Sequence, residues 1–477
     1  MLEDIKKISV SENDKYYARK WFTLSVASLV VAGLFSLFLT FSRIPFFSQF
    51  ISDPLFFKRA LVVHVDLALI VWMFSFIAAA FYVLIPGDRE KNFFNNLYFG
   101  VSVSGVGLMV ISPIVSGSAP ILANYVPVVD NSLFIAGLLM FAGGLLFTFL
   151  DSRLLWDSKK NSADAGEKAY IPGIRVAVLL FIIALEVFLV SYLNTDSSSD
   201  AKIYYEILFW GGGHLLQMAS EMVKVSIWIF LLYVLTHKYA IKRHHFFIIS
   251  GLYLLPVFIF VPYALTINPA NNDYRNLFTN LMRWGIFPFV TAVFVFCVHF
   301  LYRLKKEKIS YKLNSLPYNA FIISVILTIT GYILGAFIGG SNTMIPAHYH
   351  ASIGAVTVAF MAFAFIMLKF LDFPLPQFSK KKIVSYQPMI FGIGQITFSI
   401  GFAIAGSYGM GRKVYGAEQQ VRGFWDYLGL SIMGLGGFVA IIGGLIFLSV
   451  VLAAMWKKYT ELNAAVKILN KEESYGK

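Results

Sequence analysis

Long apolar runs and short polar segments alternate along the chain, and this pattern predicts membrane-spanning helices. Each run is close to the roughly 20 residues that an α-helix needs to cross a bilayer. Charged residues gather between the runs, as in "RLKKEK" (303–308) and "KKK" (380–382). Twelve spans are predicted, over about residues 20–44, 58–85, 93–116, 126–150, 172–194, 203–236, 245–266, 278–304, 317–340, 344–371, 386–407 and 424–456.

The fold class that follows is all-α: a polytopic membrane bundle of about twelve transmembrane helices. We expect one membrane domain over residues 20–457, between an N-terminal tail (1–19) and a C-terminal tail (458–477). The N-terminal tail is polar and has no small-residue cleavage site before the first apolar run. It is therefore expected to be a retained segment and not a signal peptide.

Composition and charge support a membrane protein. The 477 residues are 58% hydrophobic and only 14% charged, whereas soluble proteins contain about 25% charged residues. The net charge of +13 does not indicate nucleic-acid binding, because the Lys and Arg residues concentrate on loops of one predicted side. By the positive-inside rule both termini are cytoplasmic, and we expect the bacterial inner membrane. The single cysteine, Cys297, excludes a C-x-x-C-H haem attachment or a cysteine-pair metal site within this chain.

Four of the eight histidines fall at a similar depth in this topology: His64, His214, His348 and His350. Ionisable groups inside a membrane are costly and usually mark function. His348 and His350 are two residues apart, and a helix turns by about 100° per residue, so they point to nearly opposite sides. Each is therefore expected to serve a different partner. Neutral imidazoles in an apolar bundle suit haem, which needs one or two axial ligands.

Four motifs together resemble subunit I of the haem-copper oxidase superfamily, which includes terminal oxidases and nitric oxide reductases. The motifs are "HVDLALIVW" (64–72), "WGGGH" (210–214), "HYH" (348–350) and "GMGRKVYG" (409–416). The resemblance extends over all twelve predicted helices.

The resemblance implies two haems of the b or a type. His64 and His350 match the axial ligands of the low-spin haem, and His348 matches the proximal ligand of the high-spin haem, where a gas is reduced. Arg412 and Lys413 match the basic pair that holds the haem propionates. That role is physically sensible because propionates are anions.

The chain departs from the family pattern at the second metal. His214 matches one ligand, but residues 262–275, where the family has a His-His pair, contain no histidine. Asn271, Asn272 and Asp273 lie there instead, and amide oxygens are poor copper ligands. We therefore expect less than stoichiometric copper. The site either holds iron or another ion at His214, using Asp273 or Glu221 after local rearrangement, or holds no second metal.

A second departure concerns tyrosine. The family oxidases have a cross-linked tyrosine four residues after the helix-6 histidine, and this position is Met218 here. Tyr263 either replaces it in a redox or proton-transfer role, or is an aromatic residue of the membrane interface.

The predicted sixth span has a polar face. His214, Gln217, Glu221 and Lys224 follow one another at spacings that place them on one side of a helix. In a straight helix Glu221 lies about 10 Å deeper than His214, which is too far for both to bind one ion. Glu221 and Lys224 either relay protons towards the high-spin haem or form a buried ion pair that only sets helix packing.

These residues favour a respiratory oxidoreductase core that passes electrons from a low-spin to a high-spin haem and reduces O2 or NO. Electrons would come from a separate cytochrome c, cupredoxin or quinol, and small accessory subunits are expected. The alternative is a non-catalytic membrane haem protein of the same fold, for electron transfer or gas sensing, with a degenerate copper site.

Overall fold

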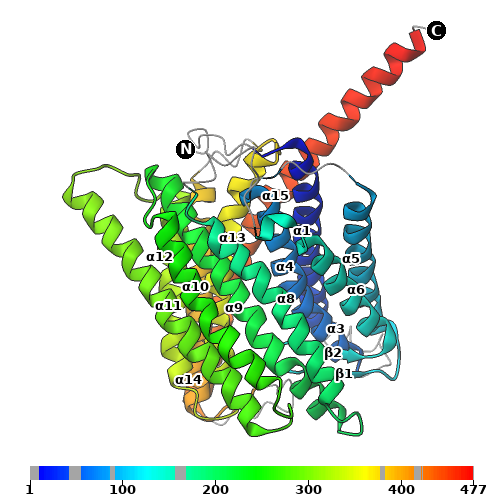
Figure 1. Cartoon of the computed structure of the whole chain (residues 1–477), viewed down its shortest axis with the longest axis vertical. Coiled ribbons are helices and arrows are strands. Elements are labelled where there is room, and N and C mark those ends of the chain that lie inside the picture. The colour runs from blue at the N-terminus through cyan, green and yellow to red at the C-terminus, as the bar shows by residue number, and fades with distance from the viewer. Residues whose placement is uncertain are drawn as a thin grey trace. The chain divides into compact units, whose positions relative to one another are not determined.

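The structure is a computed structural model that describes residues 10–41, 55–85, 87, 92–155, 168–376, 382–412, 421 and 423–475. In this part of the chain, twelve helical segments are long and apolar enough to cross a membrane. The prediction of an all-α bundle with twelve spans is therefore confirmed (Figure 1). The α-helices are α1 (Glu12–Phe41), α3 (Phe56–Asp66), α4 (Trp72–Leu84), α5 (Phe93–Ile111), α6 (Ser132–Phe149), α8 (Ile171–Asn194), α9 (Ala201–Thr236), α10 (Arg243–Ala264), α11 (Asn272–Lys306), α12 (Leu316–Ala336), α13 (Met344–Phe370), α14 (Ile383–Ser407) and α15 (Phe424–Tyr475).

Several helices extend beyond the predicted spans, among them α1, α11 and α15. Helix α1 begins at Glu12, inside the predicted N-terminal tail, because Ser11 caps it: the Ser11 hydroxyl accepts from the Asp14 backbone N–H at 3.1 Å and donates to the Asp14 carboxylate at 3.0 Å. This reciprocal pair satisfies a backbone donor that the helix start would otherwise leave without a partner. At the other end, α15 continues to Tyr475, so most of the predicted C-terminal tail is helical.

A β-hairpin replaces the predicted start of the fourth span. Strands β1 (Ala119–Ile121) and β2 (Val128–Asp130) pair antiparallel, and residues 122–127 connect them. Helix α6 begins only at Ser132, where the Asn131 side chain accepts from the Phe134 backbone N–H at 2.9 Å. The hairpin loop becomes important below, because it carries Tyr125.

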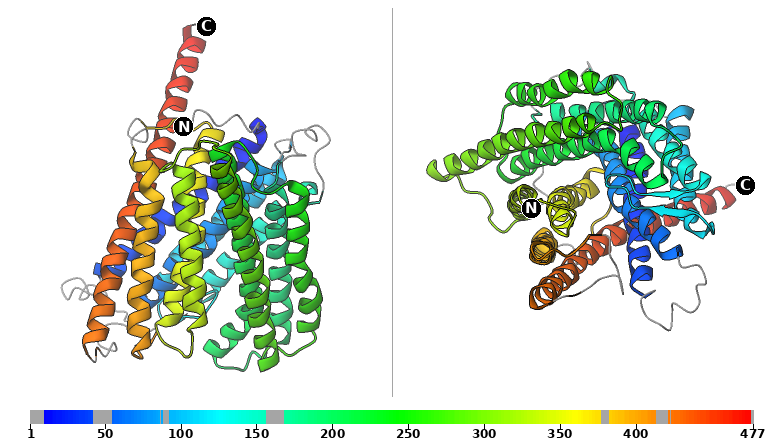
Figure 2. Two further views of the ribbon diagram at one scale, coloured as in Figure 1. Left: turned by 90° about the vertical axis from the view of Figure 1, so that its left-hand side faces the viewer. Right: turned by 90° about the horizontal axis from the view of Figure 1, so that it is seen from below.

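The helices belong to two compact units. Within the unit of residues 230–239 and 302–477, α14 and α15 run side by side (Figure 2). Glycines let their backbones touch: a Cβ added at any of five positions would overlap the backbone of the facing helix. These positions are Gly394, Gly401, Gly429, Gly436 and Gly443. Small residues commonly allow such close helix contacts in membranes.

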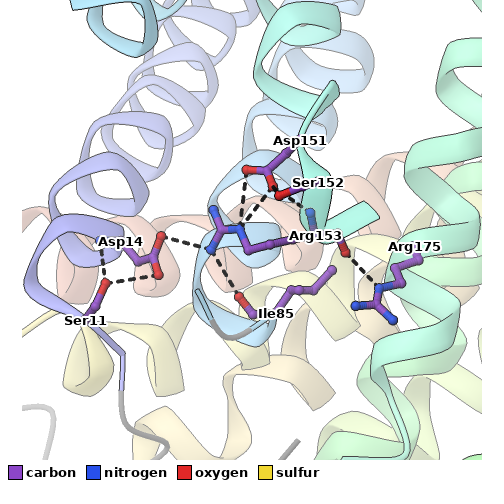
Figure 3. A network of polar contacts seen from close by, with 7 residues as sticks. All are labelled: Ser11, Asp14, Ile85, Asp151, Ser152, Arg153 and Arg175. Carbon is purple, nitrogen blue, oxygen red and sulfur yellow. Dashed lines mark hydrogen bonds and ion pairs between the residues drawn. The ribbon is translucent and has the colours of Figure 1, made fainter. Parts of the chain in front are cut away.

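Within the unit of residues 9–229 and 240–301, a buried polar cluster joins four segments (Figure 3). Arg153 follows α6, and its Nη1 lies 3.0 Å from an Asp14 oxygen of α1 and 3.3 Å from the Ile85 carbonyl after α4. Its Nε lies 3.3 Å from Asp151, and its own carbonyl accepts from Arg175 of α8 at 2.8 Å. The Arg153, Asp14 and Asp151 side chains are only 6%, 1% and 6% exposed. The cluster therefore holds the start of α1 against α4, α6 and α8.

We expect Arg153→Ala to lower the free energy of unfolding by about 3–5 kcal/mol, because two buried carboxylates lose their counter-ion. The measurement is chemical unfolding of the purified protein in detergent. Arg303→Ala is the matched control: Arg303 pairs with Glu307 at 3.0 Å, but the two side chains are 63% and 45% exposed, so the loss should stay under about 1 kcal/mol. Equal losses in the two variants would contradict a structural role for the cluster.

Candidate functional site

His64 lies near the end of α3, and a backbone hydrogen bond orients its ring. Its Nδ1 is 2.7 Å from the carbonyl oxygen of Ala32 on α1. A carbonyl only accepts, so Nδ1 carries the hydrogen and Nε2 carries the lone pair. Histidines that bind metals commonly donate their other N–H in this way, which fixes the tautomer and the ring orientation. His64 therefore has the arrangement of an axial ligand.

The helix changes character immediately after His64. Residues Leu67–Val71 form a π-helical turn, which often occurs at functional sites. Asp66, at the junction, is completely buried, and neither of its carboxylate oxygens has a hydrogen-bond partner among the described residues. Sequence reasoning missed Asp66, although an acidic residue within the apolar run "HVDLALIVW" was a visible signal.

His348 on α13 has the same ring arrangement as His64. Its Nδ1 lies 2.7 Å from the carbonyl oxygen of Gly331 on α12, so the lone pair is again on Nε2. One turn further along α12, Gly335 leaves room for the imidazole: a Cβ there would lie 2.7 Å from Nδ1 and 2.9 Å from Cε1. Gly335 therefore leaves the space for the ring, whereas Gly331 contributes its carbonyl and its own missing side chain leaves space for Ser352.

His350 faces a different helix. Its ring centroid lies 4.6 Å from that of Phe398 and 6.0 Å from that of Phe402, both on α14. His348 bonds to α12 and His350 packs against α14, so the two rings serve different neighbours, as their spacing predicts.

Arg412 lies beside the start of α13. The Thr343 backbone N–H donates to the Met410 carbonyl at 2.9 Å, and Arg412 Nε donates to the Ser341 hydroxyl at 3.2 Å. The "GMGR" segment is therefore tied to the helix end that carries both histidines of α13. Lys413, the second basic residue of the motif, lies outside the described residues.

The three glycines of "WGGGH" let three neighbours approach α9 in the turn before His214. A Cβ would overlap the Tyr274 hydroxyl of α11 at Gly211, the Phe188 ring of α8 at Gly212 and the Tyr125 ring of the hairpin loop at Gly213. Successive residues point about 100° apart around a helix. The motif thus leaves α9 without side chains on the three sides where Tyr274, Phe188 and Tyr125 pack.

His214 uses both ring nitrogens within the protein. Nδ1 lies 2.7 Å from the Trp210 carbonyl oxygen and therefore donates to it, and Nε2 lies 2.8 Å from the Tyr125 hydroxyl oxygen. Nε2 carries the only lone pair of this tautomer, so it accepts from the phenol. The residue is 1% exposed. Sequence reasoning missed Tyr125, which lies next to the predicted fourth span, 89 residues before its partner.

The other donors predicted for a second metal do not fit a copper site. Asn271, Asn272 and Asp273 are exposed, and the Asn271 side chain accepts from the Asp273 backbone N–H at 3.0 Å. Throughout the described part of the chain, no group of three or more His, Cys, Asp and Glu residues could hold a metal ion. Of the ligands predicted for the second metal, His214 is the one imidazole, and Tyr125 already engages its lone pair.

Glu221 and Lys224 form a buried ion pair. Lys224 Nζ lies 2.5 Å from Glu221 Oε2, and the two side chains are 0% and 11% exposed. The ammonium also lies 4.9 Å from the centre of the Trp228 ring.

The predicted Tyr263 is 61% exposed, whereas Tyr253, also on α10, is buried and donates to the Met218 carbonyl of α9 at 3.0 Å. Tyr253 is therefore a tyrosine of α10 that touches the helix carrying Glu221.

Comparison with known proteins agrees with the fold. The family model "Cytochrome C and Quinol oxidase polypeptide I" matches residues 17–439. An uncharacterized protein of Rickettsia prowazekii (strain Madrid E) is 25% identical, over 90% of this chain and 94% of its own. An uncharacterized protein of Aquifex aeolicus (strain VF5) is 27% identical, over 74% and 85%. Among solved structures, a heme-copper terminal oxidase dimer matches with a TM-score of 0.69 and 18% identity, over 93% of this chain and 84% of the matched one.

We expect Lys224→Met alone to lower the free energy of unfolding by about 3–5 kcal/mol, because it leaves a buried carboxylate without its counter-ion. The double variant Glu221→Gln/Lys224→Met should recover most of that loss. A double-mutant cycle measured by unfolding in detergent gives the coupling directly. Lys15 and Glu12, 2.7 Å apart with Glu12 75% exposed, provide the control cycle, whose coupling should stay under about 1 kcal/mol. Losses at Glu221 and Lys224 that simply add would contradict the pairing.

Proposed function

Because the chain belongs to the cytochrome c and quinol oxidase polypeptide I family, we propose that it is the core of a respiratory membrane oxidoreductase that reduces O2 or NO. On the family motifs, His64 and His350 would hold a low-spin haem and His348 a high-spin haem. Bound haem supplies one-electron redox chemistry and, at the high-spin iron, an open position for a gas.

One observation carries the proposal: the Nδ1 hydrogen bonds of His64 and His348. Each ring donates to a backbone carbonyl at 2.7 Å and so keeps its lone pair on Nε2. A haem ligand needs this tautomer, held in a fixed orientation. The His350 ring packs against the Phe398 and Phe402 rings of α14, which helps to orient it.

Arg412 is the residue we assign to the haem propionates. It lies beside the start of α13, the helix of His348 and His350, and a guanidinium binds carboxylates through paired hydrogen bonds. Lys413 is assigned the same role on the motif alone.

Gas reduction consumes protons, and we assign Glu221 and Lys224 to their delivery. A buried ion pair is costly to keep in a membrane protein, which favours a use beyond packing. Gln217 lies between His214 and Glu221 in sequence, and its buried Oε1 has no hydrogen-bond partner among the described residues. Polar atoms thus continue along α9 from the ion pair towards His214. We assign any tyrosine role to Tyr253 rather than to the exposed Tyr263, because Tyr253 contacts α9.

Electrons would come from a separate cytochrome c, cupredoxin or quinol. A covalent haem c or a cysteine-pair copper site in this chain would need two cysteines, and the chain has only Cys297, which is buried and free. We place the protein in a bacterial inner membrane, with small accessory subunits.

A second candidate function is a non-catalytic haem protein for electron transfer or gas sensing. The observation that favours it is the hydrogen bond between Tyr125 and His214, which engages the nitrogen that a second metal would need. Consumption of O2 and NO by the purified, reduced protein separates the candidates, alongside the copper content per haem. NO turnover with copper below one per two haems supports the oxidoreductase without a copper site, and reversible gas binding without turnover supports the second candidate. Fast O2 turnover with one copper per two haems would overturn our assignment of the second-metal position.

His64→Ala should abolish the six-coordinate low-spin absorbance and leave the high-spin signal, because the substitution removes the ligand of one haem only. Optical and electron paramagnetic resonance spectra of the purified variant provide the measurement. An unchanged low-spin spectrum would sink the assignment of His64.

His348→Ala should eliminate carbon monoxide binding by the reduced protein while most of the low-spin spectrum remains. Gly335→Ala should weaken carbon monoxide binding at least several-fold without touching the ligand, because its methyl group would press on the imidazole. Gly339→Ala is the matched control, since a Cβ there meets nothing within 4 Å. Normal binding by Gly335→Ala would show that the contact with α12 does not position His348.

A further inference from the structure

We propose that Tyr125 takes the place of the second metal on His214, so that the gas-reducing site works with haem iron alone. In this assignment Tyr125 is a positioning residue: its hydroxyl bonds to Nε2 and holds the imidazole in one orientation. The role at the gas site rests on the proposed function, whereas the hydrogen bond and the exclusion of a metal from His214 do not. We refer to Tyr125 and His214 as the phenol–imidazole pair.

The first argument is the chemistry of the lone pair. The Trp210 carbonyl takes the Nδ1 hydrogen, so the imidazole has a single lone pair, on Nε2. The Tyr125 oxygen lies 2.8 Å from Nε2, and a metal on that nitrogen would sit about 2.0–2.1 Å away. Both cannot use the same lone pair. The hydrogen bond and the metal–nitrogen bond therefore exclude each other.

The second argument is that the hairpin loop is fixed on both sides of Tyr125. Before it, the Asn124 backbone N–H donates to Glu206 of α9 at 3.1 Å, and the Asn124 side chain donates to the other oxygen of the same carboxylate. After it, the Tyr205 hydroxyl of α9 donates to Asp130 of β2 at 2.9 Å. These contacts hold the loop on α9 independently of the phenol. The hydrogen bonds between the hairpin and α9 therefore position Tyr125 next to His214.

The third argument is the packing around the ring. The centroids of Tyr125 and His214 are 4.5 Å apart, and Tyr125 stands edge-on to Trp210 at 5.5 Å with an interplanar angle of 90°. Gly213 provides the space, because a Cβ there would overlap the Tyr125 ring. The "GGGH" sequence therefore accommodates the phenol as well as the histidine.

The fourth argument is the donor set. Copper facing a haem in this family would need further imidazoles, and residues 262–275 contain none. A phenol that satisfies the remaining histidine removes the cost of a buried imidazole nitrogen without a partner. The absence of histidines in residues 262–275 and the hydrogen bond from Tyr125 to His214 are then both explained by a site without a second metal.

The test uses the purified full-length protein with ring-labelled tyrosine, in four forms: wild type, Tyr125→Phe, His214→Ala and Tyr205→Phe. The infrared difference between wild type and Tyr125→Phe identifies the C–O stretch of Tyr125. We expect this band to shift in His214→Ala, because the phenol loses its nitrogen acceptor, and to stay in Tyr205→Phe, which removes only a supporting contact. Added copper should leave the band unchanged in the wild type.

Metal content is the second readout. Copper and iron per protein should be the same in wild type and His214→Ala. A loss of one metal per protein in His214→Ala, or a Tyr125 band that His214→Ala does not move, would overturn the proposal. Neither readout needs turnover, and the spectra of the His64 and His348 variants test the haem assignment separately.

If His214→Ala does not fold, Gly213→Ala replaces it. The added methyl group would displace the Tyr125 ring and retain both polar groups, so the band should shift in the same way. Gly143→Ala is the control, since a Cβ there meets nothing within 4 Å. A band that stays in place in Gly213→Ala would count against the proposal as strongly as an unmoved band in His214→Ala.

Discussion

Inside an apolar bundle a polar group depends on the protein itself for a partner, because lipid offers no hydrogen bonds. Three imidazoles meet this requirement in the same way: His64, His214 and His348 each donate Nδ1–H to a backbone carbonyl at 2.7 Å. A helical carbonyl has two lone pairs and can accept a second hydrogen bond. Because of these hydrogen bonds, all three rings carry their hydrogen on Nδ1 and their lone pair on Nε2. What each ring does then depends only on what meets Nε2.

Missing side chains decide what can reach each ring. Gly335 lets His348 lie against α12, and Gly213 lets Tyr125 lie against α9 beside His214. Arg153 and Lys224 follow the opposite rule: both side chains are buried, and each meets a carboxylate. Glycines therefore leave space around His348 and Tyr125, whereas the buried cations Arg153 and Lys224 are balanced by carboxylates.

The spans were predictable because length and apolarity are local properties of the sequence, and the divergence of His348 and His350 followed from helical spacing. Tyr125 was not predictable, since its contact with His214 depends on a hairpin and on a separation of 89 residues. The sequence predicts that Tyr263 either has a redox or proton-transfer role or is an aromatic residue of the membrane interface, and it does not indicate that Tyr253 is a tyrosine of α10 that touches α9. The rotation of a helix with little amphipathic contrast is set by tertiary packing, which the apolar pattern does not record. The capping of α1 by Ser11 was readable from "SEND", whose serine and aspartate are three residues apart.

The π-helical turn at Leu67–Val71 also has a consequence for how this chain is compared with its relatives. A π turn accommodates one more residue than an α turn, so every side chain after it is rotated by about 100° relative to an uninterrupted α-helix. Trp72 and Phe76, both completely buried, follow this turn and are among the side chains whose direction it sets. In a relative whose helix is regular, the equivalent of His64 and the equivalent of Trp72 would be one residue closer in sequence. The divergence at this helix would then be recorded as a single-residue gap, and an ungapped alignment would pair the wrong side chains over the rest of the span.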